Sequence, residues 1–148
     1  MTAIYAIVTQ LAEWSIRLLG LVNPKLRNWV NGHRQSWKIL DELRPNGKKV
    51  VWVHVASLGE YQQAVPVLKA IRDHETSPYL LVTFFSASGY EVVKNKVVAD
   101  VACYLPLDTP FNAERFVVKV RPTIALFVKY EIWPNYLRAL TRNKVKHF

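Results

Sequence analysis

The chain has 148 residues, of which 51% are hydrophobic and 21% are charged. This composition suffices for one domain with an apolar core, and it excludes a disordered or low-complexity chain, which lacks the apolar surface to collapse. A single cysteine excludes an intramolecular disulfide and a cysteine-rich metal site, and the excess of 20 Lys and Arg over 11 Asp and Glu favours an anionic partner such as nucleic acid, phospholipid or a phosphorylated substrate.

Residues 3–22 are mostly apolar, and their spacing predicts a helix with a wide apolar face and a narrow polar stripe. The length matches the roughly 20 residues that span a bilayer. Glu13 and Arg17 interrupt the stretch as an i,i+4 pair. A helix in the membrane interface accommodates this pair more easily than a spanning helix does, and a core helix of a soluble domain is the third alternative. No Lys or Arg precedes the stretch, which disfavours a cleaved signal peptide.

The next residues carry far more basic than acidic side chains. Between positions 25 and 49 the acidic residues are Asp41 and Glu42, and the basic ones are Lys25, Arg27, Arg34, Lys38, Arg44, Lys48 and Lys49. A basic flank holds an apolar helix against anionic lipid on the cytoplasmic side. The sequence therefore predicts a membrane anchor helix over residues 1–24, a basic connecting segment over 25–49, and an anionic membrane surface as a partner.

From residue 50 the pattern changes to strands and helices that alternate with short connections. Runs rich in β-branched and aromatic residues predict buried strands over 50–55, 80–85, 101–105 and 123–128. Helical spacing follows each strand, over 61–72, 90–98, 111–120 and 133–140. This alternation is typical of an α/β domain, a Rossmann-like parallel sheet with flanking helices, here over 50–148. Residues 144–148 resemble the start of a fifth strand, so we expect an N-terminal portion of something longer.

Right-handed crossovers bring every strand-to-helix turn to the carboxyl edge of such a sheet, where open α/β sheets bind their ligands. The sequence has no glycine-rich dinucleotide motif and no Walker-type phosphate loop, which disfavours a dinucleotide or nucleoside triphosphate site of the usual kind. The candidates for a different kind of site are the turns at 57–60, 86–89, 107–110 and 129–135.

The first two turns combine glycine with side chains that can act on a ligand. Gly59 lets the backbone bend tightly, and Glu60, at the start of the next helix, could abstract a proton from a bound hydroxyl or could complement the helix dipole. Ser86, Ser88 and Gly89 offer hydroxyls and free N–H groups at a helix N-terminus. This arrangement suits either a phosphate or carboxylate cradle or ordinary N-capping.

The last two turns add two carboxylates and an aromatic ring. Asp108 can cap the helix that follows it or contact substrate, and capping is the interpretation that we favour. Glu131 lies beside Trp133, a combination that often holds sugars by ring stacking and hydroxyl hydrogen bonds, although an ordinary packed Trp gives the same pattern. His54 and Cys103 lie inside predicted strands, which indicates a satisfied core imidazole and an inert thiol.

Four segments together resemble the N-terminal half of 3-deoxy-D-manno-octulosonic acid (Kdo) transferases. They are residues 53–60 (VHVASLGE), 83–89 (TFFSASG), 104–108 (YLPLD) and 131–135 (EIWPN). Their order and spacing match, as does the preceding apolar helix with its basic flank, so the resemblance covers essentially the whole chain. It implies half of a GT-B glycosyltransferase with two Rossmann-like domains, bound to the bacterial inner membrane on its cytoplasmic side.

The resemblance also implies an activity in lipopolysaccharide biosynthesis. Such enzymes transfer Kdo from CMP-Kdo to a lipid A precursor, lipid IVA, with inversion at the anomeric carbon, and neither a cofactor nor a metal is expected for the transfer. The N-terminal domain receives the acceptor, and a C-terminal domain holds most of the CMP-Kdo site. We expect that second domain to be missing here, and the chain alone to be inactive as a transferase.

Residue by residue, the resemblance assigns the catalytic base of an S-x-G-E motif to Glu60. The positions that it assigns to substrate binding are Ser57, Gly59, Ser86, Ser88, Gly89, Asp108, Glu131, Trp133 and Asn135. The sequence departs from the family pattern at two places. The segment 86–89 has Ser-Ala-Ser-Gly where many relatives have Thr-Pro-Thr-Gly, which keeps the hydroxyls, and 129–131 has Lys-Tyr-Glu in place of Glu-Thr-Glu, so only the second Glu is carried over.

Two other functions are alternatives at this point. A different GT-B or sugar-nucleotide enzyme of the cell envelope would share the fold and use another donor. A basic nucleic-acid-binding module fits the net charge, but the sequence lacks its known motifs and has no strands with interleaved aromatic and basic side chains. We therefore expect no nucleic-acid partner.

Overall fold

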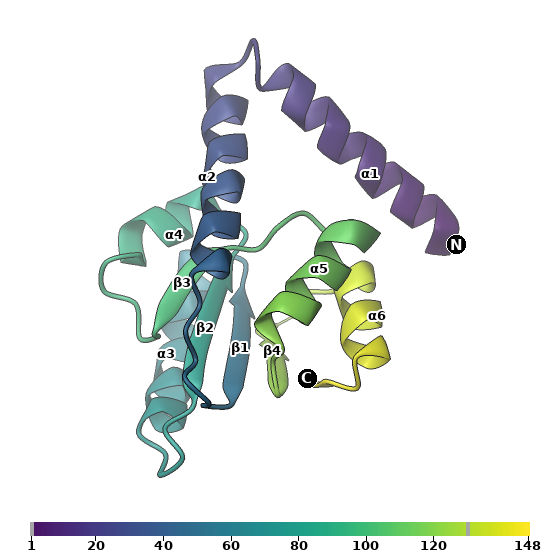
Figure 1. Ribbon diagram of the computed structural model, residues 1–148. Coiled ribbons are helices and arrows are strands. Elements are labelled where there is room, and N and C mark those ends of the chain that lie inside the picture. Colours follow the sequence, from purple (N-terminus) through teal and green to yellow (C-terminus); the bar gives the residue numbers. More distant parts are fainter. Residues whose placement is uncertain (1, 130) are drawn as a thin grey trace.

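The protein is built on one parallel sheet of five strands, in the order β3-β2-β1-β4-β5 (Figure 1). A computed structural model of the chain describes residues 2–129 and 131–148. The strands are β1 (Val50–Val55), β2 (Tyr79–Phe84), β3 (Val101–Tyr104), β4 (Ile124–Phe127) and β5 (Lys146–His147). All pairings are parallel, which confirms the α/β, Rossmann-like fold that the alternation predicts. The first four strands begin and end within one residue of their predicted bounds.

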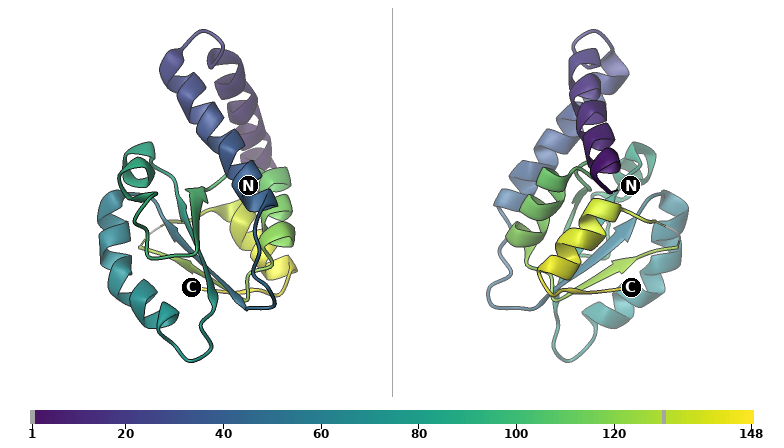
Figure 2. Two further views of the ribbon diagram at one scale, coloured as in Figure 1. Left: turned by 60° about the vertical axis from the view of Figure 1, so that its left-hand side comes forward. Right: turned by 90° about the vertical axis from the view of Figure 1, so that its right-hand side faces the viewer.

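Helices cover both faces of this sheet (Figure 2). On one face lie α3 (Leu58–Arg72) and α4 (Ala87–Val93), and on the other lie α5 (Pro110–Val120) and α6 (Pro134–Arg142). Side chains alternate along β1, so Val51, Val53 and Val55 enter the core under α3 and α4, whereas Trp52 enters the other core. Trp52 is fully buried there, in ring contact with Phe116 and Tyr136.

The basic segment after residue 24 is mostly helical, which its charge pattern did not indicate. Helix α2 (Pro24–Asp41) ends against the sheet, where Leu40 is buried with the α5 and α6 core. Ser36 fastens it to the edge strand, because its Oγ accepts a hydrogen bond of 2.9 Å from the backbone N–H of Tyr104 and donates to the carbonyl of Gly32. Helix α2 is therefore part of the domain and also carries the segment before it.

Helix α1 (Thr2–Leu19) and the first turns of α2 form an arm that leaves the body of the domain (Figure 1). Helix α1 runs back toward α5 and α6, and two polar contacts hold it there: the Tyr5 hydroxyl donates to Asp108, and Asn112 Nδ2 donates to Glu13. Among the described residues, no helix combines the length and apolarity that crossing a bilayer needs.

Candidate functional site

The turns after β1, β2 and β4 lie side by side at the carboxyl edge of the sheet. Backbone hydrogen bonds continue past the strands: Phe85 N donates to Val55 O at 3.3 Å, Ser86 N to Ala56 O at 2.9 Å, and Val128 N to His54 O at 3.0 Å. This edge therefore carries the segments 56–60 and 85–89 and the described residues of 128–133 as neighbours. It is the position at which parallel α/β sheets bind ligands.

Glu60 occupies the third position of α3 and folds back toward the strand before it. Its Oε2 accepts a hydrogen bond of 2.5 Å from the backbone N–H of Ala56, while Ser57, the N-cap residue, accepts one of 3.4 Å from the N–H of Glu60. This is close to a capping box, with Ala56 in place of the N-cap residue as donor. The side chain is half-buried, and its Oε1 has no hydrogen-bond partner among the described residues. The carboxylate is thus oriented and has one oxygen left to accept a proton.

The two glycines of these turns have different surroundings. A Cβ at Gly89 would lie 2.9 Å from Leu58 N and 3.2 Å from Ser57 C, so only glycine lets the first turn of α4 approach the first turn of α3 this closely. A Cβ at Gly59 would meet only Ser57 Oγ, at 4.0 Å. Gly89 therefore brings the two turns together, and Gly59 leaves open space beside Glu60.

The serines of the second turn start α4 without a side-chain cap. Ser86 is the N-cap residue with an extended backbone, and its half-buried hydroxyl makes no capping hydrogen bond to the helix. Ser88 lies within α4, and its side chain is outside the part of the chain that the structure describes. The N-capping alternative for Ser86 is therefore not realised by its side chain.

Asp108 caps a different helix from the one that the sequence suggested. Thr109 is the N-cap residue of α5, and its hydroxyl accepts the N–H of Asn112. The Asp108 carboxylate instead accepts the backbone N–H groups of Asn135 and Tyr136, at 3.2 and 3.0 Å, in the first turn of α6. The prediction that Asp108 caps the following helix is wrong, because the short side chain at this position turns toward α6 across the fold.

Asp108 and Asn135 are hydrogen-bonded to each other and buried beneath the carboxyl edge of the sheet. Asn135 Nδ2 donates to the Asp108 carbonyl at 2.6 Å, and both residues are 3% exposed. Burial raises the pKa of Asp108 above its usual value, although the hydrogen bonds from Tyr5, Asn135 and Tyr136 act in the opposite direction. These contacts give the pair a structural role, which fixes the start of α6 directly after Trp133.

Glu131 and Trp133 lie above the end of β1, next to His54. Glu131 Oε2 is 3.9 Å from His54 Nε2, and the Trp133 ring meets the His54 ring edge-on with centroids 5.9 Å apart. Phe85, at the end of β2, lies 5.1 Å from the Trp133 ring. The pKa of Glu131 lies below its usual value because His54 stabilises the carboxylate, an effect that outweighs burial, and Trp133 adds to it. The result is an ionised carboxylate bordered by aromatic rings.

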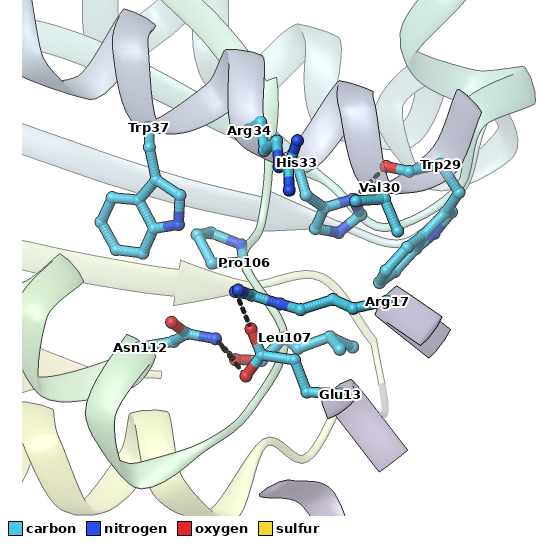
Figure 3. Close-up of a pocket in the computed structure, with 10 residues that line it drawn as sticks. All are labelled: Glu13, Arg17, Trp29, Val30, His33, Arg34, Trp37, Pro106, Leu107 and Asn112. Carbon is cyan, nitrogen blue, oxygen red and sulfur yellow. Dashed lines mark hydrogen bonds and ion pairs between the residues drawn. The ribbon is translucent and has the colours of Figure 1, made fainter. Parts of the chain in front are cut away.

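A hollow lies between the arm and the body, lined in part by Pro106 and Leu107, which follow β3 (Figure 3). Figure 3 shows Glu13 between Arg17 and Asn112, with an ion pair of 2.5 Å to Arg17. The cavity has a volume of about 40 Å³, and a neighbouring hollow of about 320 Å³ shares Glu13 and Arg17 and adds Trp14 and Arg115 to the lining. The arm therefore meets the domain through a basic and aromatic cleft.

The arm itself exposes a large apolar surface. Its apolar side chains that are more than half exposed are Ile4, Ile7, Val8, Leu11, Trp14, Leu18, Leu19, Leu21 and Val22. A contiguous patch of this kind marks a surface that contacts a partner or a membrane. No group of three or more His, Cys, Asp or Glu side chains in the described residues is placed to hold a metal ion.

The structure brings most of the predicted site residues to one edge and separates two of them. Ser57, Gly59, Glu60, Ser86 and Gly89 belong to neighbouring turns, and Glu131 and Trp133 lie at the end of the same central strand. Asp108 and Asn135 are buried behind them. His54, which the sequence indicated as a satisfied core residue, has no hydrogen-bond partner for Nε2 among the described residues, and this nitrogen lies 3.9 Å from Glu131 Oε2. His54 and Glu131 are 77 positions apart in the sequence, so strand periodicity alone does not reveal that they lie close together.

Similarity to known proteins identifies the family. The profile of the family described as 3-deoxy-D-manno-octulosonic-acid transferase (kdotransferase) matches residues 31–148. A 3-deoxy-D-manno-octulosonic acid transferase of Haemophilus influenzae is 36% identical over 142 residues, which cover 94% of this chain and 32% of the relative.

Two further relatives carry the same name in other organisms. The Aquifex aeolicus transferase is 37% identical over 98 residues, or 65% of this chain and 27% of the relative. A probable 3-deoxy-D-manno-octulosonic acid transferase, mitochondrial, of Arabidopsis thaliana is 34% identical over 98 residues, or 66% of this chain and 22% of the relative. The matched segment thus spans between about a fifth and a third of the length of these relatives.

Proposed function

The chain belongs to the 3-deoxy-D-manno-octulosonic-acid transferase family, and on this premise we propose that it is the acceptor-binding part of an enzyme that transfers Kdo from CMP-Kdo to a lipid A precursor, lipid IVA. The observation that carries the proposal is the position of Glu60. It lies half-buried at the carboxyl edge of the sheet, in a chain that the family matches over residues 31–148. The complete enzyme is then an inverting GT-B glycosyltransferase that needs no cofactor.

Glu60 is the general base in this mechanism. The hydrogen bond from Ala56 N–H to Oε2 fixes the orientation of the carboxylate. Oε1 is then the oxygen that can accept the proton of an acceptor hydroxyl. The hydroxyl oxygen attacks the anomeric carbon of Kdo while the bond from that carbon to the phosphate oxygen of CMP breaks. CMP leaves with the bonding electron pair, the proton stays on Glu60 until solvent removes it, and the anomeric configuration inverts.

The acceptor sugar is held by the turns around Glu60. Ser57 and Ser86 supply hydroxyls, the family resemblance adds that of Ser88, and Gly59 leaves space for a ring beside the base. Glu131 is an ionised acceptor for a sugar hydroxyl, and Trp133 provides an aromatic face at the same place. The donor CMP-Kdo is bound by the part of the enzyme that lies outside this chain.

The arm places the domain on an anionic membrane surface, on the cytoplasmic side of the inner membrane. Its exposed apolar side chains suit insertion into the headgroup region. The net charge of +9 adds attraction to anionic lipid, about 1 kcal/mol for each Lys or Arg that lies near the surface. An acceptor embedded in the same leaflet then meets the sheet edge without leaving the membrane.

A hybrid enzyme tests the transferase proposal. The chain replaces the matching N-terminal residues of the Haemophilus influenzae transferase, and Kdo transfer from CMP-Kdo to lipid IVA is measured by mass spectrometry. We expect transfer by the folded hybrid and none by the chain alone. A folded hybrid that binds CMP-Kdo but transfers nothing contradicts the proposal.

Flotation with liposomes tests the membrane surface. We expect binding to vesicles with anionic lipid, weaker binding at high salt, and loss of binding when Leu11 and Leu18 are both replaced by Glu. Val118→Glu is the matched control, because Val118 is about half exposed on α5, outside the arm. Equal loss in both variants, or binding that ignores the lipid charge, speaks against the arm as the membrane contact.

A further inference from the structure

His54 is a buried residue whose two ring nitrogens have different surroundings. Its side chain has no exposed surface, and its Nδ1 lies 2.9 Å from Thr83 Oγ1 on the neighbouring strand. The same Oγ1 accepts a hydrogen bond of 2.8 Å from Trp52 Nε1. The other nitrogen, Nε2, has no hydrogen-bond partner in the described part of the chain and lies 3.9 Å from Glu131 Oε2.

This arrangement favours one position for the imidazole proton. Trp52 Nε1 can only donate, so Thr83 Oγ1 accepts from it and still has its own hydrogen, which it can donate to His54 Nδ1. If Nε2 had no proton, its lone pair would face the Glu131 carboxylate 3.9 Å away, which is repulsive. A proton on Nε2 makes the contact attractive. The Glu131 carboxylate near Nε2, together with a Thr83 hydroxyl that can donate to Nδ1, therefore favours the imidazole with Nε2–H toward Glu131.

We propose that His54 is a positioning residue: held by Thr83, it directs its Nε2–H at Glu131 and fixes that carboxylate as the acceptor for a hydroxyl of the bound sugar. This role rests on the function proposed above. Glu131 lies in the turn between β4 and α6, outside any strand, and its side chain is 24% exposed. His54 lies within β1, which pairs with β2 on one side and β4 on the other, so a strand that is held on both sides positions the carboxylate.

Two further observations agree with this role. The Nε1 of Trp133 is also buried without a hydrogen-bond partner in the described residues, and its ring packs edge-on against His54. Two ring N–H groups next to one carboxylate form a pair of donors that a small inward movement of Glu131 would engage. The pKa of Glu131 is lowered chiefly by His54, which is the direction expected when the ionised carboxylate is the state that is held.

Nitrogen NMR of the chain labelled with ¹⁵N-histidine tests the tautomer directly. Long-range ¹H–¹⁵N correlations distinguish a protonated nitrogen from a bare one, and we expect a proton on His54 Nε2. A spectrum with Nε2 bare and Nδ1 protonated overturns the proposal, because the imidazole then offers Glu131 no hydrogen.

Titration of the Glu131 carboxyl by ¹³C NMR tests the link between the two residues. In the unaltered chain we expect its pKa below the usual 4.5, and in His54→Gln a value closer to 4.5. His74→Gln is the control, since His74 is exposed and contacts Thr76. A Glu131 pKa that is unchanged in folded His54→Gln overturns the proposal. If His54→Gln does not fold, Glu131→Gln replaces it, and the proposal requires the His54 Hε2 resonance to shift, whereas an unmoved resonance overturns it.

The two NMR measurements and the transfer assay of the hybrid enzyme give independent results. Both NMR measurements use the chain alone, without donor or acceptor, so a negative transfer result leaves them unchanged. A wrong tautomer, conversely, removes the positioning role while the hybrid can still transfer Kdo.

Discussion

The hydroxyl of Tyr5 donates a hydrogen bond of 2.9 Å to Oδ2 of Asp108, 103 positions later in the chain. The same carboxylate caps the first turn of α6, which starts directly after Trp133. Burial and the nearby carboxylate raise the pKa of Tyr5 to about 12, so the phenol keeps its proton and remains a donor. The arm is thus joined by one side chain to the helix behind the candidate site.

Tyr5→Phe should weaken this joint with little change of shape. We expect a loss of about 1 kcal/mol in the free energy of unfolding, because a partly buried hydrogen bond to a carboxylate disappears. Urea denaturation of Tyr5→Phe, Asp108→Asn and the double variant measures the coupling energy between the two residues. Strictly additive losses would mean that the two side chains act independently.

The pH dependence of stability reports on Asp108. Burial raises its pKa, so the folded protein holds this proton to higher pH than the unfolded chain does. Stability contributed by the protonated form is therefore lost as pH rises above the ordinary Asp pKa of 3.8. We expect the stability of the unaltered chain, relative to Asp108→Asn, to fall as pH rises from 3 toward neutrality. A difference that rises over this range would contradict the assignment.

Ser36→Ala should loosen α2 from the sheet. The substitution leaves the backbone N–H of Tyr104 buried without an acceptor, which costs about 1–3 kcal/mol. Ser15→Ala on exposed α1 is the matched control and should change stability by less than about 0.5 kcal/mol. Calorimetry of both variants checks this, and equal melting temperatures would rule out Ser36 as the fastening point.

The two glycines of the candidate site should respond differently to the same methyl group. Gly89→Ala forces a Cβ to within 2.9 Å of the Leu58 backbone, and we expect a destabilisation of about 1–3 kcal/mol. Gly59→Ala meets open space within a helix and should be neutral or stabilise by up to about 1 kcal/mol. Chemical denaturation of the pair is the measurement, and similar losses in both would show that the close approach of the two turns is not what position 89 provides.

Glu60→Gln in the hybrid enzyme should abolish most of the turnover without unfolding the protein. The amide oxygen can still accept from Ala56 N–H, but the side chain cannot take a proton, so we expect turnover to fall about 10²–10⁴-fold. Initial rates of Kdo transfer measure the effect. Exposed Glu75→Gln serves as the control, and near-normal turnover in Glu60→Gln would remove this residue from the role of base.

Local pattern predicts the sheet well, because β1, β2 and β4 are runs of β-branched and apolar residues between turn signals. It places the start of α3 at 61 and of α4 at 90, whereas these helices begin at Leu58 and Ala87. Glycines and serines in a first helical turn look like loop residues, so both helices are predicted to start three residues too late, and α4 is also predicted to end at 98, five residues beyond Val93. Helix α2 is missed because residues 25–49 stand out by charge before they stand out by helical spacing.

The residues of the candidate site likewise fall into two groups, those that are close in sequence and those that only the fold brings together. Glu60 and its cap partner Ser57 are three positions apart, so the sequence places them together directly. Asp108 accepts hydrogen bonds from residues 27 and 28 positions later, in α6. His54, in β1, lies next to Glu131, which follows the neighbouring strand β4. Alternation shows that His54 is buried, but whether both of its nitrogens find partners depends on tertiary packing that no local pattern contains.

The single cysteine gives the protein a practical property. Cys103 has no exposed surface, and burial raises the pKa of its thiol to about 12, so it stays protonated and shielded from alkylating reagents. A cysteine introduced at an exposed position, such as 59 at the sheet edge or 11 on the arm, is then the one reactive thiol. A fluorescent maleimide can be attached there without first removing the native residue, and the labelled chain can report sugar or vesicle binding optically.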